Sequence, residues 1–394
     1  MFSSPQNPIP SVEIPVSDVK RNKADIMDSM EKELLLLVIN PGSTSTKVTL
    51  FSGRREVRTE SIFHDAPELL KFRSVNDQVD MRKRVILDFL GKLDVAPSTI
   101  DIFVGRGGSA YSQHSGVFGI DERLYEDAKS AKGGSEHPAK LGILIAYEFA
   151  IEYGRKAYTV DPTNVDEFDD VARLTGIKGL YRTPQSHVLN QKGIARLHSV
   201  KTGRVYEESN YIVAHIDGGI TINAHRKGRM IDGNIGAGGD GPFTPTRIGS
   251  VPVSDIVEYL KSNDLASLDL MCSRSGGFVS YFGTSNADKV HEMVEKGDRM
   301  ATLLWRAVSY QIGKEIGAMA AVLEGKVDAI LLTGGLLRFD DLVEEVERMT
   351  GFIAPVYVYP GEVEQEAMAY SVLDVIEGKR ELSLYTGHPV FSGF

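Results

Sequence analysis

A chain of 394 residues is long enough for two domains with separate hydrophobic cores. Its 42% of hydrophobic and 25% of charged residues are typical of a globular protein, and its net charge of −10 argues against duplex nucleic acid or an anionic membrane as a main partner. Cys272 is the only cysteine, which excludes an internal disulfide and favours a reducing, cytoplasmic setting, and no apolar run approaches the ~18 residues of a membrane-spanning helix.

Residues 1–33 differ in composition from the rest of the chain. Four prolines fall within the first fifteen residues, and the mostly charged stretch "VKRNKADIMDSMEKE" follows. Such a composition cannot build a core. We expect a flexible tail here and exclude it from the fold prediction.

The first predicted strand ends in a turn rich in hydroxyl groups. "LLLLVINPGSTSTKVTLFSG", which begins at Leu34, runs from an apolar stretch through small residues into a second apolar stretch, and this pattern predicts a β-hairpin. Glycine lets the backbone approach a ligand closely, and hydroxyl and backbone N–H groups can donate to phosphate oxygens. An ordinary hairpin loop is the alternative. The candidate phosphate contacts are Gly42, Ser43, Ser45 and Lys47.

Three charged or polar residues follow later strands of the first half. Arg106 lies between a buried strand and two glycines in "DIFVGRGGSAY", and its planar guanidinium suits a carboxylate or a phosphate. Asp161 follows the strand in "AYTVDPTNVDEF", where its carboxylate could bind Mg²⁺. His187, in "YRTPQSHVLNQKG", is a candidate donor to a transition-state oxygen. Two of these predictions have an alternative. Arg106 could form a solvent-exposed salt bridge, and His187 could have a purely structural role.

The second half repeats the strand-and-turn pattern. "YIVAHIDGGITINAHRKGRM" predicts a second hairpin whose turn, Asp217, Gly218 and Gly219, could embrace a polyphosphate; Asp217 could hold a metal–water cluster or only cap the turn. "LLTGGLL" supplies a third glycine pair, Gly334 and Gly335, at a strand end where a nucleotide can bind.

Two more candidates lie in the second half. Arg247 falls in the Gly- and Pro-rich loop "GGDGPFTPTRIGSVP", and Glu364 opens the last predicted helix, residues 362–378. Glu364 is a candidate magnesium ligand. Glu362 competes with it, although a favourable charge at a helix start is the preferred explanation for Glu362.

Strands alternate with helical patterns at residues 79–93, 138–154 and 299–325, so the fold class is α/β. The two hairpins, about 175 positions apart, suggest two related halves. We expect a first domain at residues 34–185, a second at residues 186–360, and a C-terminal helix and tail, residues 361–394, that return toward the first domain.

These motifs, in this order, resemble the acetate and butyrate kinase family, which is related to actin-like sugar kinases, heat-shock ATPases and actin. The resemblance implies two actin-like (ribonuclease-H-like) domains with a nucleotide cleft between them, ATP and Mg²⁺ as cofactors, and a homodimer or higher homo-oligomer. The roles that it implies are reacting-phosphate contacts at Asn40 and Ser45, substrate carboxylate and phosphoryl contacts at Arg106 and Arg247, magnesium or acyl-substrate binding at Asp161, ATP phosphates at Asp217–Gly219, adenosine at Gly334–Gly335, and magnesium at Glu364.

The chain departs from the acetate kinase pattern at two places. "RTPQSH" stands where that branch has H-G-T-S-H, so only Ser186 and His187 match, and "HIDGG" replaces H-x-G-N-G. The loops "VGRGG" and "GGDGPFTPTRIGSVP" resemble the butyrate kinase branch instead. This resemblance implies a carboxylate longer than acetate.

The resulting prediction is a carboxylate kinase that converts butyrate or isobutyrate and ATP into an acyl phosphate and ADP. A carboxylate is ionised at pH 7, so no general base is needed, and catalysis depends on positioning and charge neutralisation. The alternatives are an acetate or branched-chain fatty acid kinase, a sugar kinase of the same fold, and a non-enzymatic actin-like nucleotide-binding protein.

Overall fold

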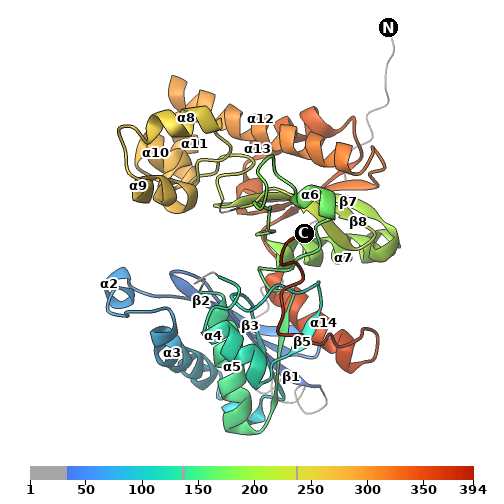
Figure 1. The fold of residues 1–394 in the computed structure, drawn as a ribbon. Helices are drawn as coiled ribbons and strands as arrows, with labels where there is room; N and C mark the ends of the chain where they lie inside the picture. Colours follow the sequence, from blue (N-terminus) through green and yellow to red (C-terminus); the bar gives the residue numbers. More distant parts are fainter. Residues whose placement is uncertain (1–32, 135–137, 237) are drawn as a thin grey trace.

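Two β-sheets, one in each half of the chain, organise the fold (Figure 1). The computed structural model describes residues 33–134, 138–236 and 238–394, so the predicted tail lies outside the described residues except for Glu33. The first sheet has the strand order β3-β2-β1-β4-β6-β5 and the second β11-β10-β7-β8-β9. The strands of the first sheet are β1 (Leu35–Pro41), β2 (Ser45–Ser52), β3 (Arg55–Phe63), β4 (Ile102–Gly105), β5 (Val117–Gly119) and β6 (Lys156–Val160).

The second sheet repeats the arrangement of the first. Its strands are β7 (Asn210–Ile216), β8 (Ile220–Arg226), β9 (Arg229–Gly233), β10 (Ala329–Gly334) and β11 (Val356–Pro360). In each sheet three antiparallel strands, β1-β2-β3 or β7-β8-β9, are followed by two strands parallel to the first, β4 and β6 or β10 and β11. This shared topology confirms the predicted α/β class with two related domains.

Helices cover both faces of both sheets (Figure 1). In the first half they are α2 (Ala66–Leu69), α3 (Val79–Lys92), α4 (Glu122–Lys129), α5 (Lys140–Tyr153) and α6 (Asp170–Arg173). In the second half they are α7 (Val188–Thr202), α8 (Val253–Tyr259), α9 (Leu265–Leu270), α10 (Gly277–Phe282), α11 (Ala287–Glu295), α12 (Arg299–Val322), α13 (Asp340–Thr350) and α14 (Glu364–Ile376). No helix among the described residues has both the length and the apolar character to cross a membrane.

Local sequence signals account for several helix ends. Asp121 and Asp298 cap α4 and α12, because their carboxylates accept hydrogen bonds from backbone N–H groups of the first turn. Gly154 and Gly203 end α5 and α7 in the left-handed conformation, which glycine adopts without steric cost. The predicted helices at 79–93, 138–154 and 299–325 are thereby confirmed as α3, α5 and α12.

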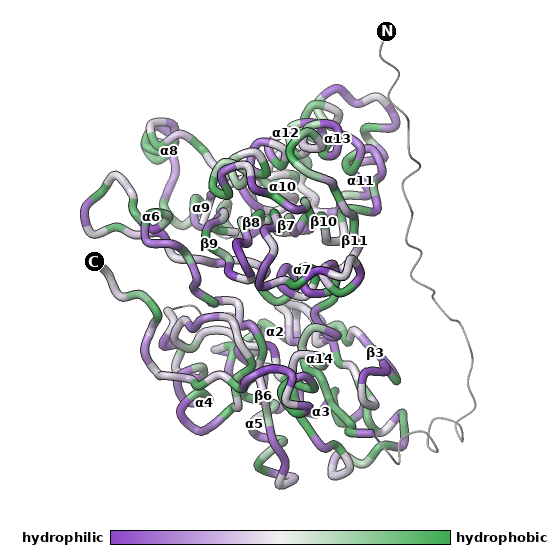
Figure 2. Tube along the Cα trace, turned by 90° about the vertical axis from the view of Figure 1, so that its right-hand side faces the viewer, coloured by the Kyte–Doolittle hydropathy of each residue, from purple (hydrophilic) through white to green (hydrophobic). Residues whose placement is uncertain are grey.

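The last helix lies on the first sheet although it follows the second in sequence. Met368 and Val372 of α14 pack with Leu36 and Val104 of the first sheet. Figure 2 shows α7 and α14 side by side between the two sheets, and they are in contact. This pair of helices joins the halves; the predicted boundary near residue 185, in the segment between β6 and α7, stays a prediction.

Candidate active site

Neighbouring strand ends bring Asn40 and Arg106 together. Ile39 of β1 is the parallel neighbour of Gly105 of β4, so the next residue of each chain segment emerges at the same edge of the sheet. Arg106 Nη1 donates to Asn40 Oδ1 at 3.2 Å. Lys47 is the register partner of Asn40 on β2, and directly paired residues point to the same face. Lys47 therefore lies on the same face of the sheet as Asn40.

Glu364, the first residue of α14, connects to this pair from the far end of the chain. Its Oε2 accepts from Asn40 Nδ2 at 2.7 Å and from Arg106 Nη1 at 2.9 Å, and Arg106 Nη2 lies 2.9 Å from Oε1. The carboxylate is buried, and its Oε1 makes no hydrogen bond of suitable angle within the described structure. Three predicted site residues thus form one cluster in which both carboxylate oxygens of Glu364 face the guanidinium of Arg106.

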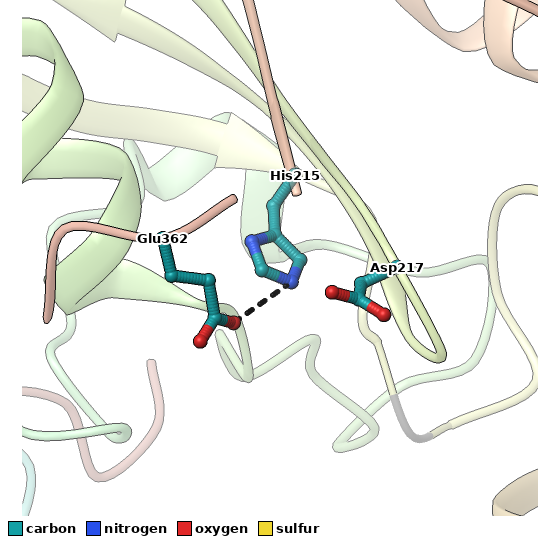
Figure 3. A group of neighbouring side chains, drawn as sticks. All are labelled: His215, Asp217 and Glu362. Carbon is teal, nitrogen blue, oxygen red and sulfur yellow. Dashed lines mark ion pairs between the residues drawn. The ribbon is translucent and has the colours of Figure 1, made fainter. Parts of the chain in front are cut away.

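A second cluster lies at the end of β7 (Figure 3). The carboxylates of Asp217 and Glu362 both point toward the His215 ring, and one ligand atom from each of the three residues lies within 4.8 Å of the others. Burial lowers the pKa of His215 to about 4. His215 is therefore neutral at pH 7. For Glu362, whose side chain is 37% exposed, partial loss of hydration together with the nearby Glu364 raises the pKa to about 7.

The hydrogen bonds of Asn190 select the tautomer of His215. Asn190 Oδ1 accepts from the backbone N–H of Val363 at 2.9 Å, so its Nδ2 must be the group 2.9 Å from His215 Nδ1. Because an amide nitrogen only donates, Nδ1 is the unprotonated ring nitrogen. The proton of the neutral imidazole is on Nε2, which lies 3.7 Å from Glu362 Oε1.

Asp217 links two of the predicted glycine turns. Its Oδ1 accepts from Gly218 N at 2.7 Å and its Oδ2 from Gly335 N at 2.8 Å. The capping role left open by the sequence is therefore present, and each oxygen keeps a lone pair for another ligand. Gly334 has φ of +114°, a region that favours glycine, so the residue type is required at this strand end.

Arg247 lies against the turn of the second hairpin. A Cβ atom on Gly219 would lie 2.5 Å from Arg247 Nη1 and 3.0 Å from His187 Cε1, so only glycine leaves room for both side chains. Arg247 Nη1 donates to the carbonyl of Gly236, and burial lowers the pKa of the guanidinium. Arg247 makes no ion pair with any carboxylate in the described ranges, and its buried Nε has no hydrogen-bond partner there.

His187 completes the group. It immediately precedes α7, its Nδ1 lies 2.9 Å from Thr221 Oγ1, and its ring stacks on His215 with centroids 3.9 Å apart. Arg106, His187 and Arg247 line one cavity of about 510 Å³. Three residues predicted from separate motifs therefore face a common space between the two sheets.

Arg82 of α3 binds the opening turn, a role that the sequence analysis missed. Its buried guanidinium donates to the carbonyl oxygens of Gly42 and Ser45 and to Thr46 Oγ1, at 2.8–2.9 Å. Burial lowers the pKa of Arg82 to about 10. Thr46 is fully buried and points toward Arg82 and His64, so its hydroxyl does not face a ligand, whereas Ser43 is exposed. No local sequence pattern pairs Arg82 with this turn.

Asp161, predicted as a metal ligand and a catalytic residue, is held by three neighbours. Its Oδ1 accepts from Ser115 Oγ at 2.6 Å and from Gly116 N at 2.9 Å, and its Oδ2 pairs with Arg196 Nη1 at 2.8 Å. The side chain is fully buried, and Arg196 holds the pKa of the carboxyl well below its usual range. Asp161 therefore anchors Arg196 of α7 to the end of β6, and its role in metal binding or catalysis stays a prediction.

Comparison with known proteins agrees with this geometry. Residues 185–348 match the model of the Acetokinase family. Among solved structures, acetate kinase from Porphyromonas gingivalis is 18% identical, covers 87% of this chain and 100% of its own, and has a TM-score of 0.74. A propionate kinase from Francisella tularensis is 16% identical over 86% of this chain and 98% of its own, with a TM-score of 0.69. Both have the same two-domain fold.

Proposed function

We propose that the protein transfers the γ-phosphoryl group of ATP to the carboxylate of a small acid and releases an acyl phosphate and ADP. The observation that carries this proposal is the half-buried guanidinium of Arg247, which lines a cavity, has no carboxylate partner among the described residues and has a buried Nε without a hydrogen bond. A positive charge that is partly removed from water and has no carboxylate partner is costly unless an anion binds beside it. The Acetokinase family domain, which contains Arg247, supports the same class of reaction.

The chemistry requires positioning and positive charge. The ionised carboxylate of the acid attacks the γ-phosphorus, the bond to the bridging oxygen of ADP breaks, and no proton has to be removed. Arg106 and His187 line the same cavity as Arg247, so up to three donors can surround the reacting oxygens. The Asn40–Arg106–Glu364 cluster holds the Arg106 fork in place before substrate binds.

The residues beside this cavity fit a magnesium ion. Hard cations prefer carboxylate oxygens. The Oε1 atom of Glu364 is buried beside Arg106 without a hydrogen bond of suitable angle, and carboxylate oxygens of Asp217 and Glu362 lie within 4.8 Å of each other. We assign Glu364 and Asp217 as the residues that would hold the ion, with Glu362 beside them. When bound, Mg²⁺ would neutralise charge on the phosphate oxygens of ATP.

Butyrate or isobutyrate is the acceptor that we propose from the sequence, because two loops resemble the butyrate kinase branch. A cavity of about 510 Å³ has room for acids of this length beside a phosphoryl group. The solved structures of this fold are acetate and propionate kinases by name, which keeps shorter acids as competitors.

The sugar kinase alternative is weakened by the position of Asp161. Phosphorylation of a hydroxyl group needs a base, and Asp161 was the candidate, but Arg196 holds the pKa of its carboxyl well below its usual range, which makes it a weak base. A non-enzymatic nucleotide-binding protein does not need a cation without a carboxylate partner, so Arg247 also argues against that alternative.

An acyl-hydroxamate assay with ATP and Mg²⁺ tests the proposal across acetate, propionate, butyrate, isobutyrate and valerate. We expect hydroxamate with at least one acid and the highest kcat/KM with an acid longer than acetate. ADP release stimulated by a sugar panel and by no acid would refute the carboxylate kinase proposal, and a maximum at acetate would refute only the choice of butyrate.

A further inference from the structure

Arg82 approaches the opening turn from the face of the first sheet that lies opposite the candidate site. Helix α3 and Ile39 of β1 belong to one hydrophobic cluster, whereas Val38 packs with α14 on the other face. Side chains alternate between the two faces of a strand, so Asn40 lies on the α14 face, where it is bonded to Arg106 of the cavity. Arg82 belongs to α3 and therefore reaches the turn from behind.

The guanidinium of Arg82 is fully buried and bonded to neutral atoms. Its Nη2 donates to the carbonyl oxygen of Gly42 at 2.9 Å, and its Nη1 donates to the carbonyl oxygen of Ser45 and to Thr46 Oγ1, both at 2.8 Å. Gln78 Oε1 accepts from its Nε at 3.2 Å and from its Nη2 at 2.9 Å. No carboxylate that the structure describes pairs with it, and burial lowers its pKa to about 10. A buried cation of this kind is costly, which indicates a role beyond packing.

The bonds of Arg82 orient the backbone of the turn. The described residues contain no cis peptide bond, and in a trans peptide the N–H points opposite to the preceding C=O. Because Arg82 holds the carbonyl of Gly42, the N–H of Ser43 points away from Arg82. Ser43 is exposed, and its N–H makes no hydrogen bond to another described residue. The turn therefore offers a backbone donor that points away from α3.

Further bonds support the same conformation. His64 N donates to the carbonyl of Thr44 at 2.9 Å, and His64 Nε2 lies 2.8 Å from Thr46 Oγ1, the hydroxyl that accepts from Arg82. Arg82 itself bonds the carbonyls on either side of the two exposed residues, Ser43 and Thr44. A turn that is fixed in advance loses less backbone entropy when a ligand binds to it.

We propose that Arg82 is a positioning residue for phosphoryl transfer. From the α3 side it holds the carbonyls of Gly42 and Ser45, so that the N–H of Ser43 and the exposed hydroxyls of the turn face the transferred phosphoryl group of ATP. Arg82 itself does not line the cavity. This inference rests on the carboxylate kinase activity proposed above, and it predicts an effect on kcat and not on the binding of the acid.

Lysine in place of Arg82 tests the geometry of the guanidinium. Lysine keeps the charge, but an ammonium group cannot reproduce the planar fork that bridges both carbonyls. With the full-length protein, ATP, Mg²⁺ and butyrate or the most reactive acid of the panel, we expect Arg82→Lys to lower kcat by ~10-fold or more and to keep the KM of the acid within ~3-fold. The matched control is Arg84→Lys, at an exposed position of the same helix, which should keep kcat within ~2-fold. A wild-type kcat in Arg82→Lys, or a raised KM of the acid at unchanged kcat, would overturn the inference.

Two variants of Thr46 keep the inference testable where Arg82→Lys does not fold. Thr46→Val keeps the shape of this buried side chain but removes the hydroxyl that accepts from Arg82, whereas Thr46→Ser keeps the hydroxyl. At a temperature where melts show folded protein, we expect Thr46→Val to lower kcat by ~10-fold and Thr46→Ser to stay within ~3-fold. A lowered melting temperature with unchanged kcat in every variant that folds would leave Arg82 a structural role alone and overturn the inference. Absence of hydroxamate from the wild-type protein with every acid would instead refute the proposed function, and this inference with it.

Discussion

Two arginines on one cavity have different surroundings. Arg106 is neutralised by Glu364, whereas Arg247 has no carboxylate partner in the described chain. Arg247 is therefore the better candidate for the charge that develops on the transferred phosphoryl group, and Arg106 for the incoming carboxylate. A residue that acts in the transition state changes kcat, and a residue that acts in the ground state changes KM.

Alanine variants of both arginines separate these roles. Arg247→Ala should reduce kcat by ~10²-fold or more, the usual scale for one preorganised donor. Arg106→Ala should raise the KM of the acid more than Arg247→Ala does, and it should lower the melting temperature because Glu364 loses its buried cation. Steady-state kinetics with ATP-binding calorimetry would check both. Wild-type turnover in Arg247→Ala would remove this residue from the site.

Two adjacent glycines in the second hairpin, Gly218 and Gly219, provide a test variant and its matched control. A Cβ at Gly219 collides with Arg247 and His187, whereas nothing lies within 4 Å of a Cβ at Gly218. We expect Gly219→Ala to lower kcat by ~10-fold or more through displacement of Arg247, and Gly218→Ala to keep kcat within ~3-fold at saturating ATP. Equal kcat values in the two variants would show that Arg247 does not need its present position.

Buried histidines should make folding stability depend on pH. Burial lowers the pKa of His198 to about 4, and the nearby Arg204 and Lys201 act in the same direction. Between pH 6.5 and about 4 the unfolded chain binds a proton that the native state excludes, so stability falls as the pH falls through this window. His225, also buried, adds to the effect.

Thermal melts across this pH window test the histidine account. His198→Gln keeps a polar partner for Tyr359 and should flatten the decrease in melting temperature by several degrees. The matched control, His114→Gln at an exposed position, should follow the wild-type curve. An unchanged slope in His198→Gln would mean that other groups set the acid limit.

At the scale of elements, the strand ends and the helix pair α7–α14 position the site. Gly193 of α7 is close-packed on α14, since a Cβ there would lie 2.9 Å from Ala367 Cβ. The Asp161–Arg196 ion pair also holds α7 against the end of β6. His187 immediately precedes α7, and Glu364 is the first residue of α14. The packing of these two helices therefore fixes the distance between the Asn40–Arg106–Glu364 cluster and the cluster around His215.

Variants of the β6–α7 ion pair test whether Asp161 has only an anchoring role. Arg196→Met leaves a buried carboxylate without its cation and should cost about 3–5 kcal/mol of unfolding free energy. Adding Asp161→Asn removes that charge, so the double variant should regain part of the stability and, if Asp161 only anchors α7, keep kcat within ~3-fold. Stability restored together with a kcat lowered ~10²-fold would support Asp161 as a catalytic or metal-binding residue.

The helices and strands, and the site residues at the strand ends, could be predicted from the sequence. Apolar runs that end in glycine are local signals, and they correctly indicated both hairpins and the turns that contain Gly219 and Gly334. Partners were not predictable, because Arg196 lies 35 positions from Asp161 and Glu364 lies 324 positions from Asn40. Loss of hydration and the neighbouring Glu364 raise the pKa of the Glu362 carboxyl to about 7, an effect that no local pattern at a helix start predicts.

At the scale of the whole molecule, two related domains enclose a cavity whose charge comes from both. Arg106 belongs to the first sheet and Arg247 to a loop of the second half, so the reacting groups can be held only when the halves are apposed. Closure around the substrates would exclude water that otherwise hydrolyses ATP or the acyl phosphate.

The transfer of ¹⁸O from a labelled carboxylate tests the central claim most directly. The protein is incubated with ATP, Mg²⁺ and a doubly ¹⁸O-labelled acid, and hydroxylamine then cleaves the acyl phosphate at its carbonyl carbon. Direct attack of the carboxylate on the γ-phosphorus predicts that the phosphate released contains one ¹⁸O atom, in an amount equal to the ADP formed. Phosphate without label, or ADP formation that does not depend on the acid, would contradict the account.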